Sequence, residues 1–292
     1  MQSNTSLRIG LIGLGLMGHG IGRNLLKNGF ALTVMGNVNR APVDSLVSLG
    51  ANESKSVAEL VDASDVVMLC VTGSPQVESL MNRDQGILQS IRPGQIVIDC
   101  STSQPSSSAI INAALLEAGA LFVDAPLGRT PAEAEAGKLN VMVGATPQLL
   151  EHIRPVLQAF CENIIHVGEV ISAQKLKLIN NFAVVGTAAL LTEALRACDQ
   201  VGVSRQAMYD LMSKGPLQGG LLQATVAEIL RENYAGMKFS INNAYKDIGY
   251  FNNMLGATEA KNSLSSSLLD VLVNAVDQDL GDSYLPNLVK AV

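Results

Sequence analysis

Two kinds of hydrophobic pattern divide the chain near residue 170. Before that point, short apolar runs alternate with stretches in which apolar residues have helical spacing. Most of these runs are apolar on both faces, as the buried strands of a parallel sheet are. They predict strands at residues 7–13, 31–36, 65–71, 95–100, 121–126, 140–145 and 164–168. The alternation of strands and helices predicts a doubly wound α/β sheet.

After residue 170 the strand pattern stops, and helical spacing continues to the end of the sequence. One helix is predicted from Ser172 to Val201, which at about 1.5 Å per residue is about 45 Å long. Residues 182–191 in its middle are apolar on every face, so we expect them to be buried between domains or in an oligomer interface. Two domains are therefore predicted, an α/β domain at 1–168 and an all-α domain at 169–292.

Composition narrows the class of protein. The 292 residues are 48% hydrophobic and 16% charged, with a net charge of −6, which favours a globular protein and disfavours nucleic-acid binding. The four cysteines are scattered and no metal-ligand cluster can be assembled, so no metal site and a reducing compartment are expected. Neither a signal peptide nor a membrane span is evident. We expect a cytoplasmic protein without a membrane partner.

A glycine motif follows the first predicted strand. Residues 12–24 read "IGLGLMGHGIGRN", and Gly13, Gly15 and Gly18 have the GxGxxG spacing between a strand and a helix. Such glycines permit a tight turn and a close approach of the backbone to a pyrophosphate, which the helix N-terminus then stabilises. The motif predicts a dinucleotide site made by the loop residues Gly13, Leu14, Gly15, Leu16, Met17 and Gly18.

The end of the second strand bears on the choice of nicotinamide cofactor. An acidic residue there favours NAD, and an arginine without one favours NADP. No carboxylate stands at Gly36 or Asn37, and Arg40 follows shortly. We therefore favour NADP over NAD, with Asn37 and Arg40 as cofactor contacts. The alternative is that Arg40 is a solvated surface charge.

Polar residues also follow later strands and the start of the long helix. Ser101 and Thr102 come after the predicted strand 95–100, where ligands bind in such sheets, although both could instead be helix caps. Lys177, Asn180 and Asn181 share one face of the long helix. Lys177 could simply extend to water, or it could transfer a proton at a reacting oxygen beside a nicotinamide.

Five short motifs together resemble the β-hydroxyacid dehydrogenases. They are "IGLGLMG" at 12–18, "DCST" at 99–102, "DAPLG" at 124–128, "KLINN" at 177–181 and "YKDIG" at 245–249. Their order and spacing resemble that family from about residue 7 to 285. The resemblance implies a Rossmann domain, a long bridging helix and an all-α domain, with assembly into homodimers or homotetramers.

The resemblance also implies site residues. Lys177 matches the catalytic lysine, and Asn180 and Asn181 match the asparagines beside the substrate. Val71 and Thr102 match cofactor contacts. Lys246 matches a lysine that covers both nicotinamide and substrate, with Asp247 fixing it. The implied reaction is NAD(P)-dependent interconversion of a small anionic β-hydroxy acid and its aldehyde.

Residues 127–130 depart from the family pattern, as does the stretch before Lys177, which has Gly168 alone in place of a glycine-rich run. Most members read "DAPVSGG", whereas this chain has Leu127-Gly128-Arg129-Thr130. Thr130, Pro131 and Glu133 predict a capped helix start, so Gly128 and Arg129 lie where an anion is favoured. The variant resembles the sulfolactaldehyde reductase branch, and an arginine fork suits a sulfonate. Arg129 could instead pair with a surface acid such as Glu133 or Glu135.

The expected substrate contacts are Ser101, Gly128, Arg129, Thr130, Asn180, Asn181 and Lys246. Two other hypotheses are an imine reductase-like enzyme and a non-catalytic dinucleotide-binding scaffold. Relatives of both kinds usually replace the catalytic lysine, which is intact here. A 6-phosphogluconate dehydrogenase would need a much larger helical domain.

Overall fold

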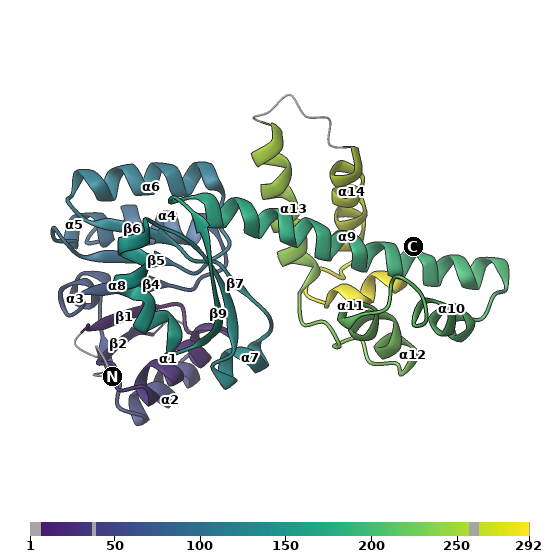
Figure 1. Ribbon diagram of the computed structural model, residues 1–292, viewed down its shortest axis with the longest axis horizontal. Helices are drawn as coiled ribbons and strands as arrows, with labels where there is room; N and C mark the ends of the chain where they lie inside the picture. The colour runs from purple at the N-terminus through teal and green to yellow at the C-terminus, as the bar shows by residue number, and fades with distance from the viewer. Residues whose placement is uncertain (1–6, 37–38, 257–262, 292) are drawn as a thin grey trace. The chain divides into compact units, whose positions relative to one another are not determined.

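The computed structural model describes residues 7–36, 39–256 and 263–291, and its contacts divide the chain into two compact units (Figure 1). The first unit ends at Lys177 and the second begins at Leu178, so the division falls inside the long helix α9 (Ser172–Val201). The predicted bounds of that helix are confirmed. Each unit is described by itself below.

The first unit is built on one sheet whose strands mostly match the predicted apolar runs. The strands are β1 (Ile9–Ile12), β2 (Leu32–Met35), β3 (Asn52–Ser54), β4 (Val66–Leu69), β5 (Ile96–Asp99), β6 (Leu121–Asp124), β7 (Leu127–Gly128), β8 (Leu139–Gly144) and β9 (Cys161–Gly168). Their order is β3-β2-β1-β4-β5-β6-β8-β7, with β9 paired to β8. The first six strands run parallel, as a Rossmann sheet requires.

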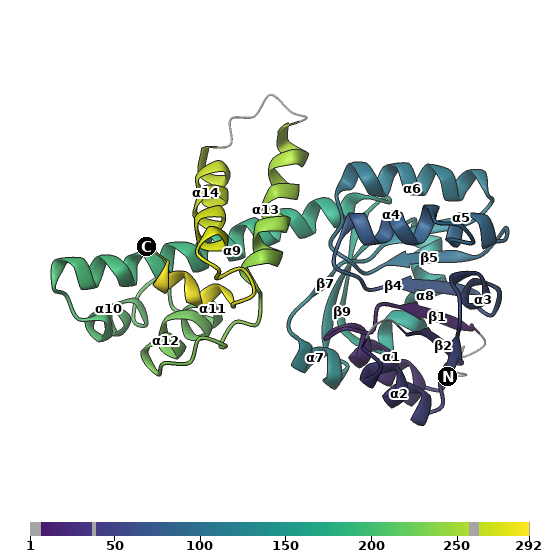
Figure 2. The same ribbon diagram turned by 180° about the vertical axis from the view of Figure 1, so that it is seen from behind.

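Helices cover both faces of this sheet (Figures 1 and 2). One face packs against α1 (Gly18–Lys27), α2 (Ala41–Ser48), α7 (Pro131–Ala136) and α8 (Pro147–Gln158). The other packs against α3 (Val57–Asp62), α4 (Ser74–Asn82), α5 (Ile87–Ser90) and α6 (Pro105–Glu117). Two separate apolar cores result, which explains why most strands are apolar on both faces.

Three features of the sheet differ from the prediction. The short strands β3 and β7 were not predicted, since "NES" has no apolar pattern and two residues are too few to show one. β8 runs antiparallel to β6 and β7. The segment between β7 and β8 is too short for a parallel crossover, which needs a dozen or more residues.

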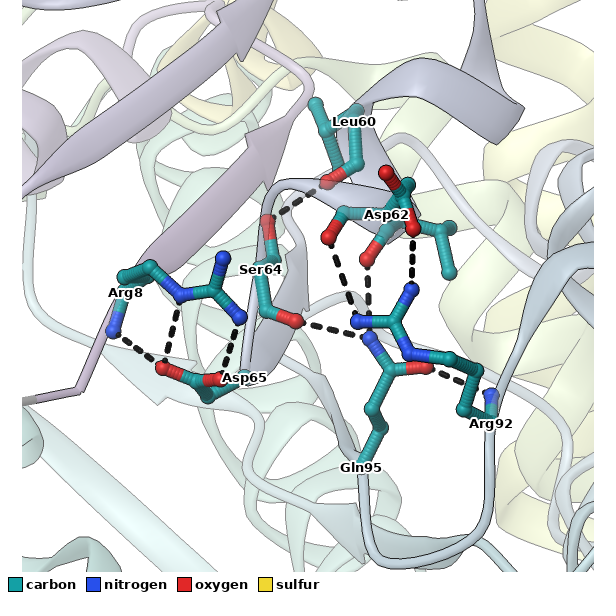
Figure 3. A network of polar contacts seen from close by, with 8 residues as sticks. Arg8, Leu60, Asp62, Ser64, Asp65, Arg92 and Gln95 are labelled. Carbon is teal, nitrogen blue, oxygen red and sulfur yellow. Dashed lines mark hydrogen bonds and ion pairs between the residues drawn. The ribbon is translucent and has the colours of Figure 1, made fainter.

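A network of polar contacts joins the segments that precede β1, β4 and β5 (Figure 3). The Arg8 guanidinium, just before β1, donates to both carboxylate oxygens of Asp65, just before β4, at 2.7 and 3.1 Å. The side-chain amide of Gln95, just before β5, donates to the carbonyls of Val61 and Ser64 at 2.8 and 2.7 Å. These contacts therefore lie at the amino ends of the strands, opposite the carboxyl ends where ligands are expected.

The second unit is helical. It contains most of α9 together with α10 (Arg205–Met212), α11 (Gly220–Leu222), a π-helix (Gln223–Ala227), α12 (Glu228–Leu230), α13 (Ile241–Gly256), α14 (Ser263–Asp277) and a 3-10 helix (Leu285–Lys290). Val185, Ala188 and Leu195 of α9 are fully buried in its cores. By length and composition α9 could cross a membrane, but 44% of its most apolar window is buried inside the protein.

Candidate active site

The glycine loop after β1 fits a dinucleotide. Gly13 has φ +96°, and a Cβ there would lie 2.2 Å from the Cys70 carbonyl oxygen. A Cβ on Gly18 would lie 1.8 Å from the Gly13 carbonyl oxygen, so the chain's own packing demands both glycines. A Cβ on Gly15 would meet no atom within 4 Å. Gly15 therefore faces open space, as expected where a pyrophosphate approaches the backbone.

The neighbouring strand ends are joined through Ser101. Its side-chain oxygen accepts the backbone N–H of Val71 at 3.0 Å, and the residue is almost fully buried. The capping alternative for Ser101 and Thr102 is wrong, because α6 begins at Pro105 with Gln104 as its N-cap. The structure thus brings Val71, Ser101 and Thr102 to one edge of the sheet, beside the glycine loop that contacts Cys70.

Two buried carboxylates stand side by side at this edge, since Asp99 and Asp124 are register partners of β5 and β6. Asp124 accepts the backbone N–H groups of Ile171 and Gln174 at 2.7 and 2.8 Å, at the start of α9. Asp99 accepts the backbone N–H of Ser101 at 2.9 Å and the Ser103 hydroxyl at 2.8 Å. Burial raises the pKa of Asp99 to about 6 and also raises the pKa of Asp124.

Gln174 bridges α9 to the loop that follows β5. Its side-chain Nε2 donates to the Ser101 carbonyl at 2.8 Å, and its Oε1 accepts the Ser103 backbone N–H at 2.9 Å. The side chain is fully buried. The first turn of α9 is therefore fixed to this loop, and Lys177 follows three residues later, half-buried. No local pattern in the sequence marks Gln174, because the partners of its side chain are 71 and 73 residues away.

Arg129 lies in the loop that precedes α7. Its Nη1 donates to the Lys138 carbonyl at 2.6 Å and forms an ion pair with the half-exposed Glu162, so Arg129 does pair with a surface acid, although with Glu162 rather than Glu133 or Glu135. The predicted helix start is confirmed, with Thr130 as N-cap and Glu133 completing the capping box. Gly128, half-buried in β7, pairs with Asn140 of β8. The substrate role of this loop remains a prediction.

Glu135 has a different partner set. Its carboxylate binds His19 Nδ1 at 2.7 Å and Arg23 Nη1 at 2.6 Å, which joins α7 to α1. These two partners lower the pKa of Glu135 against the opposing effect of burial. The helix that follows the Arg129 loop is thereby tied to the helix that follows the glycine loop.

In the second unit, three of the predicted residues form one cluster. Asn181 Nδ2 donates to Asp247 Oδ2 at 2.6 Å, and Lys246 Nζ lies 2.7 Å from Asp247 Oδ1. Lys246 also lies over the Tyr250 ring at 4.9 Å from its centroid. Asn180 is exposed and donates to Asn181 Oδ1 at 3.4 Å. Asp247 thus holds Lys246 and Asn181 together, as the resemblance implied for Lys246.

Arg40 is exposed at the surface, as the alternative to a cofactor contact expected, and it pairs there with two acidic residues. Its guanidinium donates to Glu53 Oε1 and Oε2 at 2.5 and 3.0 Å and to Asp44 Oδ1 at 2.9 Å. Asn37, the other predicted contact at this position, lies outside the described residues. Glu53 was missed because it comes from β3, a strand that the hydrophobic pattern did not reveal.

Within residues 7–36, 39–256 and 263–291, no three His, Cys, Asp or Glu side chains group as metal ligands would.

Comparisons with known proteins show which protein family the chain belongs to. The family model described as the NAD binding domain of 6-phosphogluconate dehydrogenase matches residues 8–168. The one described as NAD-binding of NADP-dependent 3-hydroxyisobutyrate dehydrogenase matches residues 172–291. The 2-(hydroxymethyl)glutarate dehydrogenase of Eubacterium barkeri is 31% identical over 84% of this chain and 81% of its own length.

Two further proteins agree. The NAD-dependent L-serine dehydrogenase of Pseudomonas aeruginosa is 37% identical over 71% of this chain and 69% of its own. The fold matches the solved 3-hydroxyisobutyrate dehydrogenase of Mycobacterium tuberculosis, with L-serine, at a TM-score of 0.87 and 24% identity, over 97% and 98% of the two chains.

A Rossmann sheet, a glycine loop that fits a pyrophosphate and these relatives define an NAD(P)-dependent oxidoreductase that acts on CH–OH groups. Within that class, the chain belongs to the β-hydroxyacid dehydrogenase family.

Proposed function

We propose that this protein interconverts a small anionic β-hydroxy acid and its aldehyde, with Lys177 as general acid in reduction and general base in oxidation. The observation that carries the proposal is the attachment of α9. Asp124 fixes its first turn to the end of β6, the Gln174 side chain fixes it to the loop after β5, and Lys177 stands three residues further on. A lysine held in this way can transfer a proton at the reacting oxygen.

The other residues have supporting roles in this proposal. The nicotinamide supplies or accepts the hydride when it is bound. The backbone of residues 13–18 and the N-terminus of α1 hold the pyrophosphate. Asn181, held by Asp247, orients the hydroxyl oxygen, and Asn180 stands beside it. Lys246, held by the same aspartate, covers the nicotinamide and substrate.

The substrate class is proposed from the loop at 128–130 together with Ser101. The two dehydrogenases named above carry the names of small molecules with a carboxylate and a hydroxymethyl group, which supports a primary alcohol and its aldehyde. Arg129 makes both of its contacts through Nη1, so its guanidinium has further N–H donors for an anion. We propose a sulfonate, as in sulfolactaldehyde, because its three oxygens suit such a fork.

The test is oxidation of NADH and NADPH with sulfolactaldehyde, succinate semialdehyde, methylmalonate semialdehyde, tartronate semialdehyde and glyoxylate. We expect Lys177→Ala to lower kcat by about 10²- to 10⁴-fold while the Kd of the reduced nucleotide stays unchanged. Lys175→Ala, two residues earlier and exposed, is the matched control and should keep full activity. Arg129→Ala should raise KM for the sulfonate by about tenfold or more.

Other outcomes separate the alternatives. Turnover that ignores Arg129 would keep the dehydrogenase and remove the sulfonate assignment. Full activity in the Lys177 variant would refute the proposed acid–base role. Reduction of a cyclic imine in place of every aldehyde would favour an imine reductase. Nucleotide binding without turnover of either kind would favour a non-catalytic scaffold.

A further inference from the structure

Gly36 directly follows the carboxyl end of β2, and neighbouring side chains occupy the space where a side chain of its own would lie. A Cβ built on Gly36 would lie 2.9 Å from Arg40 Nη1 and 3.3 Å from Glu53 Oε1. Rossmann domains read the cofactor ribose at this strand end, and an acidic side chain there accepts the 2′-hydroxyl. Here a carboxylate reaches the same place from another strand.

The fold brings Glu53 to this point. β3 runs parallel to β2 with Glu53 as the register partner of Val34, two residues before Gly36. The Glu53 side chain lies on the exposed face of this edge strand. Arg40, the N-cap of α2, approaches from the other direction and binds both oxygens of the carboxylate. Such a two-point contact fixes the orientation of a carboxylate as well as its position.

The charges at this strand end do not favour a second phosphate. Arg40 faces two carboxylates, Glu53 and Asp44. Hydrogen bonds with these acids raise the pKa of Arg40, and Arg40 in turn lowers the pKa of Glu53, so Arg40 and Glu53 stay ionised near neutral pH. Lys55 is the other cation close enough to lower the pKa of Glu53. A 2′-phosphate at Gly36 would meet an ionised carboxylate whose counter-charge is already in use.

We propose that Glu53, held in place by Arg40, is a specificity-determining residue that accepts the ribose 2′-hydroxyl and makes the protein prefer NAD over NADP. This reverses the preference that Arg40 alone indicates in the sequence. The role of Arg40 is to position Glu53 rather than to bind phosphate. The inference rests on the dinucleotide dependence of the proposed function and on nothing about its hydroxy acid.

The experiment is a fluorescence titration of the full chain with NADH and with NADPH, giving a Kd for each. The wild type should bind NADH at least tenfold more tightly. Glu53→Gln keeps the side-chain shape, removes the charge and releases Arg40, so it should tighten NADPH binding at least tenfold and weaken NADH binding severalfold. Glu59→Gln removes one charge from nearby α3 without touching Arg40 and should leave both constants unchanged.

A second variant tests the role of Arg40. In Arg40→Ala we expect NADH binding to weaken, because Glu53 loses its support, without a selective loss of NADPH. A wild type that prefers NADPH, with that preference lost in Arg40→Ala or Lys55→Ala, would overturn the proposal. So would an unchanged NADPH/NADH ratio in Glu53→Gln. Because the readout is nucleotide binding, failure to turn over any aldehyde would leave these results valid.

Discussion

At the scale of single residues, burial raises the pKa of Asp99 and Asp124, whereas ion pairing lowers the pKa of acids nearer the surface. Asp99 is fully buried with a pKa raised to about 6, because burial disfavours its charged form more than its hydrogen bonds favour it. The half-exposed Asp65 has a lowered pKa, because Arg8 favours its charged form. The two groups therefore make opposite contributions to the pH dependence of stability.

The first prediction concerns that pH dependence. Folded Asp99 keeps its proton to higher pH than the unfolded chain does, so its contribution to the free energy of unfolding is lost as pH rises from about 4 to 6. A pKa raised from 3.8 to about 6 corresponds to about 3 kcal/mol. Asp99→Asn removes this loss and can still accept from the Ser101 N–H and donate to Ser103. We expect denaturant unfolding to give Asp99→Asn a higher free energy of unfolding than the wild type, with a difference that grows between pH 4 and 7.

Asp65→Asn is the control for that experiment. The lowered pKa of Asp65 contributes stability above pH 4, and this contribution is lost as the pH falls below 4. Asp65→Asn should therefore be less stable than the wild type at neutral pH and as stable as the wild type in acid. Parallel pH profiles of the wild type and Asp99→Asn would show that Asp99 titrates normally in the folded protein.

At the scale of elements, the sheet is fixed at both edges by side-chain amides. Gln174 joins α9 to the loop after β5 at the carboxyl edge, where the proposed chemistry takes place. Gln95 joins β5 to the end of α3 at the amino edge (Figure 3). Each satisfies buried backbone groups that secondary structure leaves without partners.

The second prediction concerns Gln95. Gln95→Leu would leave the carbonyls of Val61 and Ser64 and the N–H of Arg92 without their partner. We expect the free energy of unfolding to fall by about 2–4 kcal/mol, since each buried polar group left unpaired costs about 1–3 kcal/mol. The Kd for NADH should stay within about twofold, because this edge is opposite the glycine loop.

Gln158→Leu, at an exposed position of α8, is the comparison and should change stability by less than about 0.5 kcal/mol. If Gln95→Leu changed the nucleotide Kd as strongly as the stability, the two edges of the sheet would not be independent.

At the scale of the whole molecule, the helical unit exposes large apolar side chains. Leu190 in the middle of α9 is 62% exposed and Leu211 of α10 is 75% exposed. The sequence predicts burial of residues 182–191, and several of them, such as Val185 and Ala188, are buried within the unit. A helix that is apolar all round and keeps Leu190 on the surface favours an interface between copies of this chain.

The third prediction is therefore a homo-oligomer. We expect size-exclusion chromatography with light scattering to give a multiple of the 30.7 kDa chain mass, and Leu190→Asp to shift the protein toward a single chain. Ile110→Asp, at a position of α6 in the first unit that is 73% exposed, should leave the mass unchanged. A wild-type mass of 30.7 kDa at micromolar concentration would contradict the prediction.

The sequence by itself determined the architecture and the cofactor loop. Strands buried on both faces must be apolar throughout, and a pyrophosphate loop needs glycines at fixed spacing, so both features are written in neighbouring residues. The 30-residue helix and the capped start at Thr130 are equally local, and the structure has them where the pattern predicts. The assignments of Lys177 and Asn181 came from motifs in register and stay predictions.

Only the tertiary structure decided which distant side chains meet. The pairing of Arg129 with Glu162, of Arg40 with Glu53, and of Gln174 with the loop after β5 joins residues 13 to 73 positions apart. No hydrophobic period records such contacts, because polar side chains are placed by the strands and helices that carry them. The acidic residue missing from the end of β2 in the sequence is present there in space, and it arrives on β3.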